Sequence, residues 1–473
     1  MARVLIINPP SPEQLGAPLL GLQYVASALL AHGCEVKIID AAARYYEGDF
    51  DSIVAEAERF APDVVGFSLF SRWVWHAYRL VERFSGRFPL LFAGGAHTTV
   101  LAEETLEHGF DVAIEGEAED PFVRLIDSLG HPEDFGQIAG VVYRASDGTI
   151  RRGPPAKLVE NLDDLPLPLE SQSLFDPKWY HPSGNETIPG GILSSRGCPA
   201  RCTFCANYVT GRSFRHRSSA SVVEELNLYH ERFGTTFFPF WDDALTTNKP
   251  RLFELCEAIE RDIEFDLKWS AITRANMVSP ELVQAMRRAG CVSLNFGVES
   301  GDNEILRAIK KGITIEFVVR ALTMAKDEGM LTACNFMLGF PQETPESLGR
   351  TLAFMQRIEP MVDSFSTLGV LVPFPGTPLY DDYHVEHGFT DWWLREECSH
   401  YSKPPPIDDF DRFYRHYIDD TNLELDFFHY SNEMRAMIKE CLRFKGEHNL
   451  AKMGLMRDPV FRPEPALAGV GAA

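Results

Sequence analysis

Short apolar runs alternate with helix-like segments through the first 145 residues of the chain. Val4–Ile7 is a continuous apolar run, as expected of a parallel strand whose two faces are both covered. Leu19–His32 has apolar residues at helical spacing and is followed by Gly33, a residue that favours the end of a helix. The same pattern predicts four further strands, at Glu35–Ile39, Asp63–Ser68, Leu90–Ala93 and Asp111–Ile114.

This regular succession of strands and helices predicts a doubly wound parallel sheet with strand order 2-1-3-4-5. Ligands of such sheets bind beyond the carboxyl ends of the strands. Polar residues and glycines stand at those ends here, and glycine lets the backbone come close to a ligand. The candidate binding residues of this domain are Asn8, Ser68, Gly94, Gly95, His97, Gly116 and Glu117.

A second series of strand–helix repeats follows a proline-rich connection. The prolines of Pro154-Pro155 and Leu162–Pro168 make this connection unsuited to helix. Polar and glycine residues again follow the strands, at the ends where barrels of strands and helices place their active sites. The six predicted strands are Ile192–Ser195, Thr236–Trp241, Leu267–Ile272, Val292–Val298, Leu331–Leu338 and Phe365–Val372.

The remaining residues predict a helical C-terminal region. Phe410, Phe413, Tyr414 and Tyr417 recur at helical spacing, which favours packing in a core. We therefore expect a first domain at 1–145, a linker at 146–187, a barrel-like domain at 188–380, a helical region at 381–455 and a flexible tail at 456–473.

Composition limits the classes of function. The chain has 473 residues, of which 45% are hydrophobic, enough for a large core. Its formal charge of −23 argues against nonspecific binding to nucleic acid or to an anionic membrane, since both need a basic surface. No run approaches the ~18 apolar residues of a membrane span. The N-terminus leads directly into a strand pattern, so we expect no signal peptide and a cytoplasmic protein.

Three cysteines in one short segment, Cys198, Cys202 and Cys205, have the spacing C-x3-C-x2-C. Three thiolates on one loop can hold three irons of a [4Fe–4S] cluster, and the fourth iron is then open for chemistry. The alternative is a zinc site, but such sites usually use paired cysteines or cysteine and histidine pairs. The nearest histidine, His216, lies among arginines, which disfavour a bound cation.

The cysteine segment resembles the signature of the radical S-adenosylmethionine (radical SAM) enzymes. The resemblance implies that the open iron binds SAM, that cleavage of SAM gives a 5′-deoxyadenosyl radical, and that the strand–helix repeats form a partial (β/α)6 barrel. It also implies roles for strand-end residues, although a structural role as a cap or surface ion pair is the alternative for each. The implied SAM-binding residues are Phe204, Asp242, Asp243, Arg274, Glu299 and Gly339.

Placed before such a segment, the first domain resembles the cobalamin-binding domain of the cobalamin-dependent (class B) radical SAM family. The similar elements are Asn8-Pro9-Pro10, Pro62–Ser68, Gly94–His97 and Glu115–Glu119. The first loop lacks the Asp-x-His-x-x-Gly motif of classical cobalamin proteins, so the resemblance implies cobalt without a histidine from this loop. His97 is an alternative ligand, but a structural role in ordering its loop is favoured.

The resemblance implies methylation of an unactivated carbon, or of phosphorus, in a small-molecule substrate. Cobalamin would carry the methyl group, and an external donor such as flavodoxin or ferredoxin would reduce the cluster. Two alternatives stay open. One is a radical SAM reaction without methyl transfer, such as cyclisation, rearrangement or transfer of another fragment of SAM. The other is an iron–sulfur redox sensor or binding protein.

Overall fold

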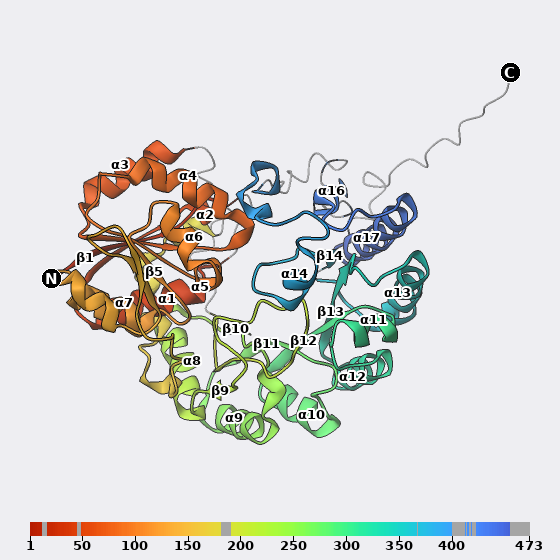
Figure 1. Cartoon of the computed structure of the whole chain (residues 1–473). Coiled ribbons are helices and arrows are strands. Elements are labelled where there is room, and N and C mark those ends of the chain that lie inside the picture. Colours follow the sequence, from red (N-terminus) through yellow and green to blue (C-terminus); the bar gives the residue numbers. More distant parts are fainter. Residues whose placement is uncertain are drawn as a thin grey trace. The chain divides into compact units, whose positions relative to one another are not determined.

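The computed structural model describes residues 1–11, 17–44, 49–180, 191–366, 368–399, 412, 414–415, 418 and 422–454 (Figure 1). It divides into two compact units: the first contains Met1–Ile272, Gln284–Cys291 and Pro373–Tyr401, and the second contains the rest of the chain. The predicted tail at 456–473, the last residues of the predicted linker, and Phe410, Phe413 and Tyr417 lie outside the described residues.

The first unit contains the predicted parallel sheet. Its first five strands are parallel in the order β2-β1-β3-β4-β5, as the sequence predicted. Two antiparallel strands that were not predicted extend the sheet beyond β5 and carry it to Arg152. The strands are β1 (Arg3–Asn8), β2 (Glu35–Asp40), β3 (Val64–Ser68), β4 (Leu91–Gly94), β5 (Val112–Ile114), β6 (Val141–Arg144) and β7 (Ile150–Arg152).

Helices cover both faces of this sheet, with α1 and α7 on one face and α3 and α4 on the other (Figure 1). Leu22 and Leu29 of α1 and Leu125 of α7 are buried in one core with Val4 and Ile114. Full burial of each such side chain is worth about 1.5–3 kcal/mol. The helices are α1 (Leu20–Ala31), α2 (Ala41–Arg44), α3 (Phe50–Phe60), α4 (Val74–Phe84), α5 (Ala96–Val100), α6 (Ala102–Glu107) and α7 (Glu119–Asp127).

The cysteine segment and the start of the second strand series also belong to the first unit. Strand β10 pairs in parallel with β11. The first predicted strand of this series is reduced to a single parallel bridge from Ile192 to Phe240, because Ser195 and Arg196 pair antiparallel with Arg215–His216 instead. The elements are β8 (Ser195–Arg196), β9 (Arg215–His216), α8 (Ser219–Phe233), β10 (Phe237–Phe240), α9 (Lys249–Asp262), β11 (Lys268–Thr273), α10 (Pro280–Arg288) and α14 (Pro378–Tyr383).

The second unit contains the later strands of the series. Strands β12, β13 and β14 pair in parallel in sequence order, and the C-terminal helix α17 packs on α13. Helix α13 begins with a capping box of Thr344 and Ser347. The elements are β12 (Cys291–Glu299), α11 (Asn303–Ala308), α12 (Ile315–Asp327), β13 (Leu331–Leu338), α13 (Pro345–Ile358), β14 (Leu368–Val370), α16 (Asn422–Leu425) and α17 (Asn432–Lys452).

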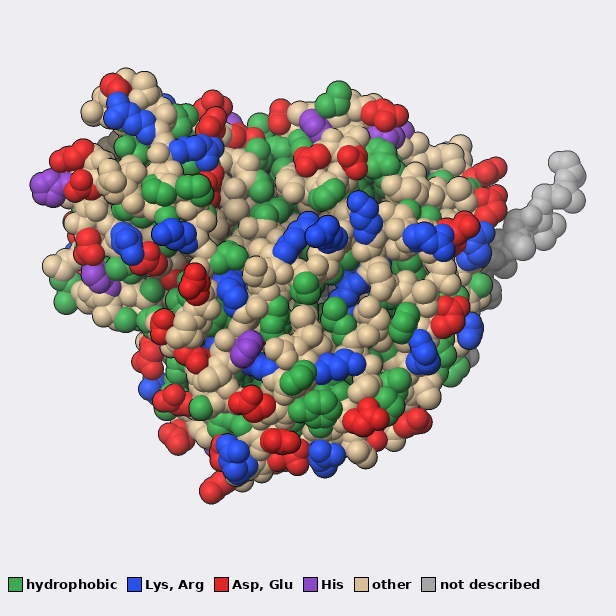
Figure 2. All heavy atoms as spheres, turned by 60° about the horizontal axis from the view of Figure 1, so that its bottom comes forward, with side chains coloured by type: hydrophobic (Ala, Val, Ile, Leu, Met, Phe, Trp, Pro, Cys, Tyr) green, Lys and Arg blue, Asp and Glu red, His purple; other side chains and the backbone are tan. Residues whose placement is uncertain are grey.

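The surface carries charges of both signs. Figure 2 shows basic side chains gathered toward the middle of the displayed face and acidic side chains mainly around them. In the part of the chain that the structure describes, no helix has the length and apolar character needed to cross a bilayer.

We predict that Gly301→Ala destabilises the second unit while Gly349→Ala does not. A Cβ on Gly301 would lie 2.6 Å from Cβ of Phe354 and 2.7 Å from Cα of Thr351, whereas at Gly349, within α13, the nearest atom is 3.9 Å away. Chemical denaturation should show a loss of about 1–3 kcal/mol for Gly301→Ala. The helical glycine variant should gain up to about 1 kcal/mol. Equal stability of the two variants would contradict the packing argument.

Candidate functional site

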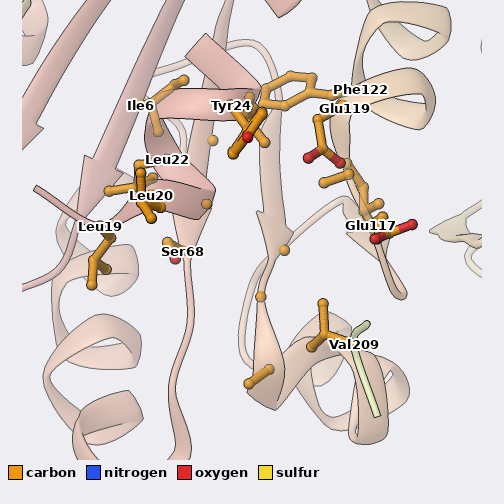
Figure 3. A pocket seen from close by; sticks show the side chains of 18 of the residues that line it. Ile6, Leu19, Leu20, Leu22, Tyr24, Ser68, Glu117, Glu119, Phe122 and Val209 are labelled. Carbon is orange, nitrogen blue, oxygen red and sulfur yellow. The ribbon is translucent and has the colours of Figure 1, made fainter. Parts of the chain in front are cut away.

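A cavity of about 780 Å³ lies at the carboxyl ends of the parallel strands in the first unit. Ser68 ends β3, Gly94 ends β4, and Gly116 and Glu117 follow β5. Figure 3 shows Leu19, Leu20 and Leu22 on one side of the cavity and Glu117, Glu119 and Val209 on the other. Leu193, Arg196, Val209, Thr210 and Trp241, from the cysteine segment and the strands beside it, also line this cavity.

Two neighbouring glycines, Gly94 and Gly95, line the cavity, and the space around them differs. Gly95 has φ +101°, and a Cβ there would lie 2.8 Å from the carbonyl oxygen of Leu69, so both backbone and space require glycine. At Gly94 the nearest neighbour of an added Cβ would be Cβ of Ala118, 3.9 Å away, so this position is open. The open backbone fits the close approach of a large flat ligand, which is what a corrin ring would need.

The cavity brings together five of the seven residues predicted for cobalamin: Ser68, Gly94, Gly95, Gly116 and Glu117. The other two, Asn8 and His97, are buried and lie outside its lining. Asn8 donates a hydrogen bond to Oδ1 of Asp40 at 2.9 Å. The described lining of the cavity contains no histidine, cysteine or methionine.

His97 is enclosed by polar partners. Its Nδ1 lies 3.0 Å from Oγ of Ser71, and its Nε2 lies 2.9 Å from the hydroxyl of Tyr78 and 3.2 Å from Oε1 of Glu104. Burial lowers the pKa of His97, although the neighbouring Glu104 carboxylate opposes this shift. Trp393 also donates to Glu104, so this cluster joins the 373–401 segment to the first sheet within the same unit.

The cysteine loop joins β8 to β9. Cys202 is buried, Cys198 is half-buried and Cys205 is exposed. Phe204, predicted to lie by adenine, is half-buried between the last two cysteines. The three thiols are the donor type that an iron–sulfur cluster needs. Among the described residues, no three side chains of His, Cys, Asp or Glu already converge as metal ligands.

The two aspartates after β10 lie against the start of this loop. Asp243 Oδ2 accepts hydrogen bonds from the amide of Gly197 at 2.9 Å and from the hydroxyl of Thr210 at 2.8 Å. Asp242 is buried and accepts from the hydroxyls of Ser194, at 2.7 Å, and Ser195. Burial raises the pKa of Asp242, against the opposing effect of the Arg251 guanidinium. Sequence analysis missed Thr210 and the serines, which no motif links to the aspartates.

In the second unit, Glu299 is held by an ion pair. Its Oε1 accepts a hydrogen bond from Nζ of Lys311 at 2.6 Å, and both side chains are about nine-tenths buried. Glu299 has φ +72°, at an irregularity of β12, and such a backbone is costly for a residue other than glycine. Arg274 donates to the carbonyl oxygen of Lys311, so these three residues form one group.

The turn after β13 is fixed by two side chains that were not predicted. The hydroxyl of Tyr430 donates to the carbonyl oxygen of Gly339 at 2.6 Å. The amides of Gly339 and Phe340 donate to Oε2 of Glu343 at 2.6 and 3.1 Å. Burial raises the pKa of Glu343 to about 8, because the cost of burying its charge exceeds the benefit of these two amides.

Comparison with known proteins identifies the class. Residues 192–355 match the family model described as the Radical SAM superfamily, and residues 16–126 match the B12 binding domain. The chain is 31% identical over 391 residues to the "Uncharacterized methyltransferase PH0819" of Pyrococcus horikoshii, covering 80% of this chain and 82% of that protein. The chain therefore belongs to the radical SAM superfamily. It is a member of the branch that carries a cobalamin-binding domain.

Other relatives match most of the length of the chain. The chain is 26% identical over 398 residues to the anaerobic magnesium-protoporphyrin IX monomethyl ester cyclase of Rubrivivax gelatinosus, covering 80% of this chain and 70% of that one. The solved structure of the methyltransferase TsrM from Kitasatospora setae, with cobalamin and [4Fe–4S] cluster bound, is 20% identical, has a TM-score of 0.64 and covers 82% of this chain and 79% of that chain. This likeness confirms the predicted fold class, a doubly wound sheet followed by a partial barrel. The cofactors of the class are the cluster, SAM and cobalamin.

We predict that Asp243→Ala weakens retention of the cluster. It removes the acceptor for the Gly197 amide and the Thr210 hydroxyl; because Asp243 is exposed, each lost hydrogen bond costs about 0.5–1.5 kcal/mol. Iron per chain after anaerobic reconstitution should fall well below wild type. Asp243→Asn retains an acceptor oxygen and should keep most of the iron. Full iron content in Asp243→Ala would show that this carboxylate does not brace the loop.

We predict a pH-dependent gain of stability for Glu343→Gln. The pKa of Glu343 is about 8 in the fold and near 4.5 when unfolded, so the folded chain binds the extra proton between these values. The stability that the Glu343 proton contributes is complete below the pKa of the unfolded chain and is lost as the pH rises through the pKa of the folded chain. The free energy of unfolding falls by at most about 1.4 kcal/mol per pH unit in this range. Denaturation from about pH 5 to about pH 9 should show this slope for wild type and not for Glu343→Gln.

The matched control is Glu346→Gln in the first turn of α13. Glu346 is exposed and hydrogen bonds lower its pKa, so it is ionised throughout that pH range and its replacement should leave the slope unchanged. If the stability of Glu343→Gln depended on pH as steeply as that of wild type, the proton responsible would belong to another group.

Proposed function

We propose that this chain is a methyltransferase that transfers a methyl group to an unactivated carbon, or to phosphorus, of a small molecule. The observation that carries the proposal is the cavity of the first unit. Its lining combines the strand ends of the B12-binding domain with Val209 and Thr210 of the cysteine loop and Arg196 at the start of that loop. A cobalamin in this cavity and a cluster on this loop would face a common space, as transfer of a methyl group from SAM at the cluster to cobalamin would require.

When bound, the cluster and SAM supply radical formation, and cobalamin supplies a carrier for the methyl group. The chain's part is to hold, orient and shield these groups. We propose that Cys198, Cys202 and Cys205 bind the cluster. Ser68, Gly94, Gly95, Gly116 and Glu117 would form the cobalamin cavity, and Phe204, Asp243, Arg274, Glu299 and Gly339 would line the SAM site.

The observed contacts change the expected roles of three predicted residues. Asp242 is buried and accepts from two serine hydroxyls at Oδ1 and from the Ser194 amide at Oδ2, so we propose that it supports the strand end and does not touch SAM. Asn8 and His97 are committed to Asp40 and to Ser71, Tyr78 and Glu104, so we propose that they shape the domain from outside the cavity. Cobalamin would then bind without a protein imidazole on cobalt.

We further propose that the electron donor is an external protein such as flavodoxin or ferredoxin and that neither nucleic acid nor membrane is a partner. The net charge of −23 supports the second statement, because nucleic acids and anionic membranes attract basic proteins. A cytoplasmic location is proposed with it, because a low-potential cluster needs a reducing compartment.

The second candidate is a radical SAM reaction without methyl transfer. The 26% identity to the magnesium-protoporphyrin ester cyclase supports this second candidate, because that relative is named for a cyclisation. The two candidates differ in products. Methyl transfer from SAM leaves S-adenosylhomocysteine, whereas radical formation leaves 5′-deoxyadenosine and methionine.

We predict that reduced, cluster-loaded protein forms S-adenosylhomocysteine from SAM only when cobalamin is also bound. Chromatography of the quenched reaction measures both products. The variant with Cys198, Cys202 and Cys205 all changed to Ala should lose iron and form no 5′-deoxyadenosine. Formation of 5′-deoxyadenosine without S-adenosylhomocysteine in the cobalamin-loaded protein would favour the second candidate. Absence of both products would favour a redox sensor or binding protein.

A further inference from the structure

A buried network of charges lies in the wall of the cavity. The guanidinium of Arg196 donates through Nη1 to Oε1 of Glu117 at 2.9 Å and through Nη2 to Oε1 of Glu119 at 2.7 Å. The side chains of Arg196, Glu117 and Glu119 are 5%, 2% and 6% exposed. One planar group therefore bridges two carboxylates that lie two residues apart after β5.

Glu117 also binds the other side of the cysteine loop. Arg215 donates to both oxygens of Glu117, at 2.9 and 3.0 Å, and to the carbonyl oxygen of Thr210 at 2.8 Å. The amide of Val159 donates to Oε2 of Glu117 at 2.6 Å. Two carboxylates and two guanidiniums thus share one largely buried cluster with no net charge.

The two arginines hold equivalent places at the two ends of the loop. Arg196 directly precedes Gly197 and Cys198, and it is the register partner of Arg215 in the β8–β9 pair. Everything between them, including all three cysteines, forms the loop. Glu117 consequently forms ion pairs with residues at both ends of the loop.

The same residues face the ligand cavity. Glu117, Glu119, Arg196 and Tyr24 all line it, and Figure 3 shows the two glutamates and Tyr24 around it. The Arg196 guanidinium lies 4.7 Å from the centre of the ring of Tyr24, a residue of α1. A ligand that fills the cavity must contact the network that holds the cysteine loop.

Stability alone does not account for this arrangement. Burying four charges is costly, and buried ion pairs often contribute little net stability compared with apolar side chains of similar size. What the network does fix is geometry, because each guanidinium nitrogen has a defined acceptor.

We propose that Arg196 is a positioning residue that couples occupancy of the cavity by cobalamin to the conformation of the cysteine loop. This inference rests on the proposed function. Filling the cavity restrains Glu117 and Glu119, they restrain Arg196 and Arg215, and the loop is thereby held in the conformation that binds the cluster. By reciprocity, a bound cluster then strengthens cobalamin binding by the same factor.

The test is a thermodynamic cycle. The dissociation constant of hydroxocobalamin is measured by equilibrium dialysis under anaerobic conditions, for cluster-loaded and for cluster-free protein. Wild type should bind cobalamin about fivefold or more tightly when the cluster is present, which is ordinary coupling between sites. In Arg196→Lys, which keeps the charge but cannot bridge both carboxylates, the two constants should become nearly equal.

Arg212→Lys is the control, since Arg212 is an exposed arginine on the same loop and its variant should keep the full ratio. Glu119→Gln, which replaces one charged acceptor of the bridge by a neutral one, should lower the ratio and serves as the test if Arg196→Lys does not fold. A wild-type ratio near one, or an unchanged ratio in a folded, iron-loaded Arg196→Lys, would overturn the coupling while leaving methyl transfer possible. No cobalamin uptake by wild type would overturn both proposals.

Discussion

In the first unit, parallel strands covered on both faces leave mainly their ends for polar chemistry, and this constraint organises the sheet and its cavity. Side chains on the strands are buried against helices, so a polar group there would lose its water without a partner. In the first unit Ser68, Gly94 and Glu117 stand at or just beyond strand ends, and in the second unit Glu299 and Gly339 do so. The candidate site residues therefore lie at the carboxyl ends of the strands.

Buried carboxylates at these edges need partners, and the partners fix their orientation. Glu299 has Lys311, Asp242 has two serines, and Glu117 has two arginines. Where such a carboxylate meets a ligand, as proposed for Glu299, it need not first be ordered, which reduces the entropy lost on binding. Glu343 shows the opposite case: it has two amides but no cation among the contacts described above, and the pKa of its carboxyl rises accordingly.

Sequence patterns identified what depends on local chemistry. Continuous apolar runs located the five parallel strands and their order, and cysteine spacing identified the loop between β8 and β9. The short hairpin strands β6 and β7 were missed, because three or four residues carry too little periodicity. Ile192–Ser195 was predicted as a regular strand, yet its last residue pairs across the cysteine loop. That choice depends on Arg215, which is distant in sequence.

The partners of the site residues could not be predicted for the same reason. Thr210, Lys311 and Tyr430 reach their acceptors Asp243, Glu299 and Gly339 only once the chain has folded. Their residue types are common, and no spacing ties them to the motif that they support. His97 illustrates the converse, since its position after two glycines suggested a ligand while its buried partners lie on other elements.

The C-terminal region is part of the support of the site within the second unit. Tyr430 holds the turn at Gly339, α17 packs on α13, and Asn449 of α17 bonds both the amide and the carbonyl oxygen of Phe365 at 3.0 Å. Because Gly339 has φ +88° and its amide serves Glu343, a shift of Tyr430 would move a turn that already depends on glycine. Changes in this region would therefore act on the geometry of the β13 turn, while the cofactor chemistry itself stays that of the cluster, SAM and cobalamin.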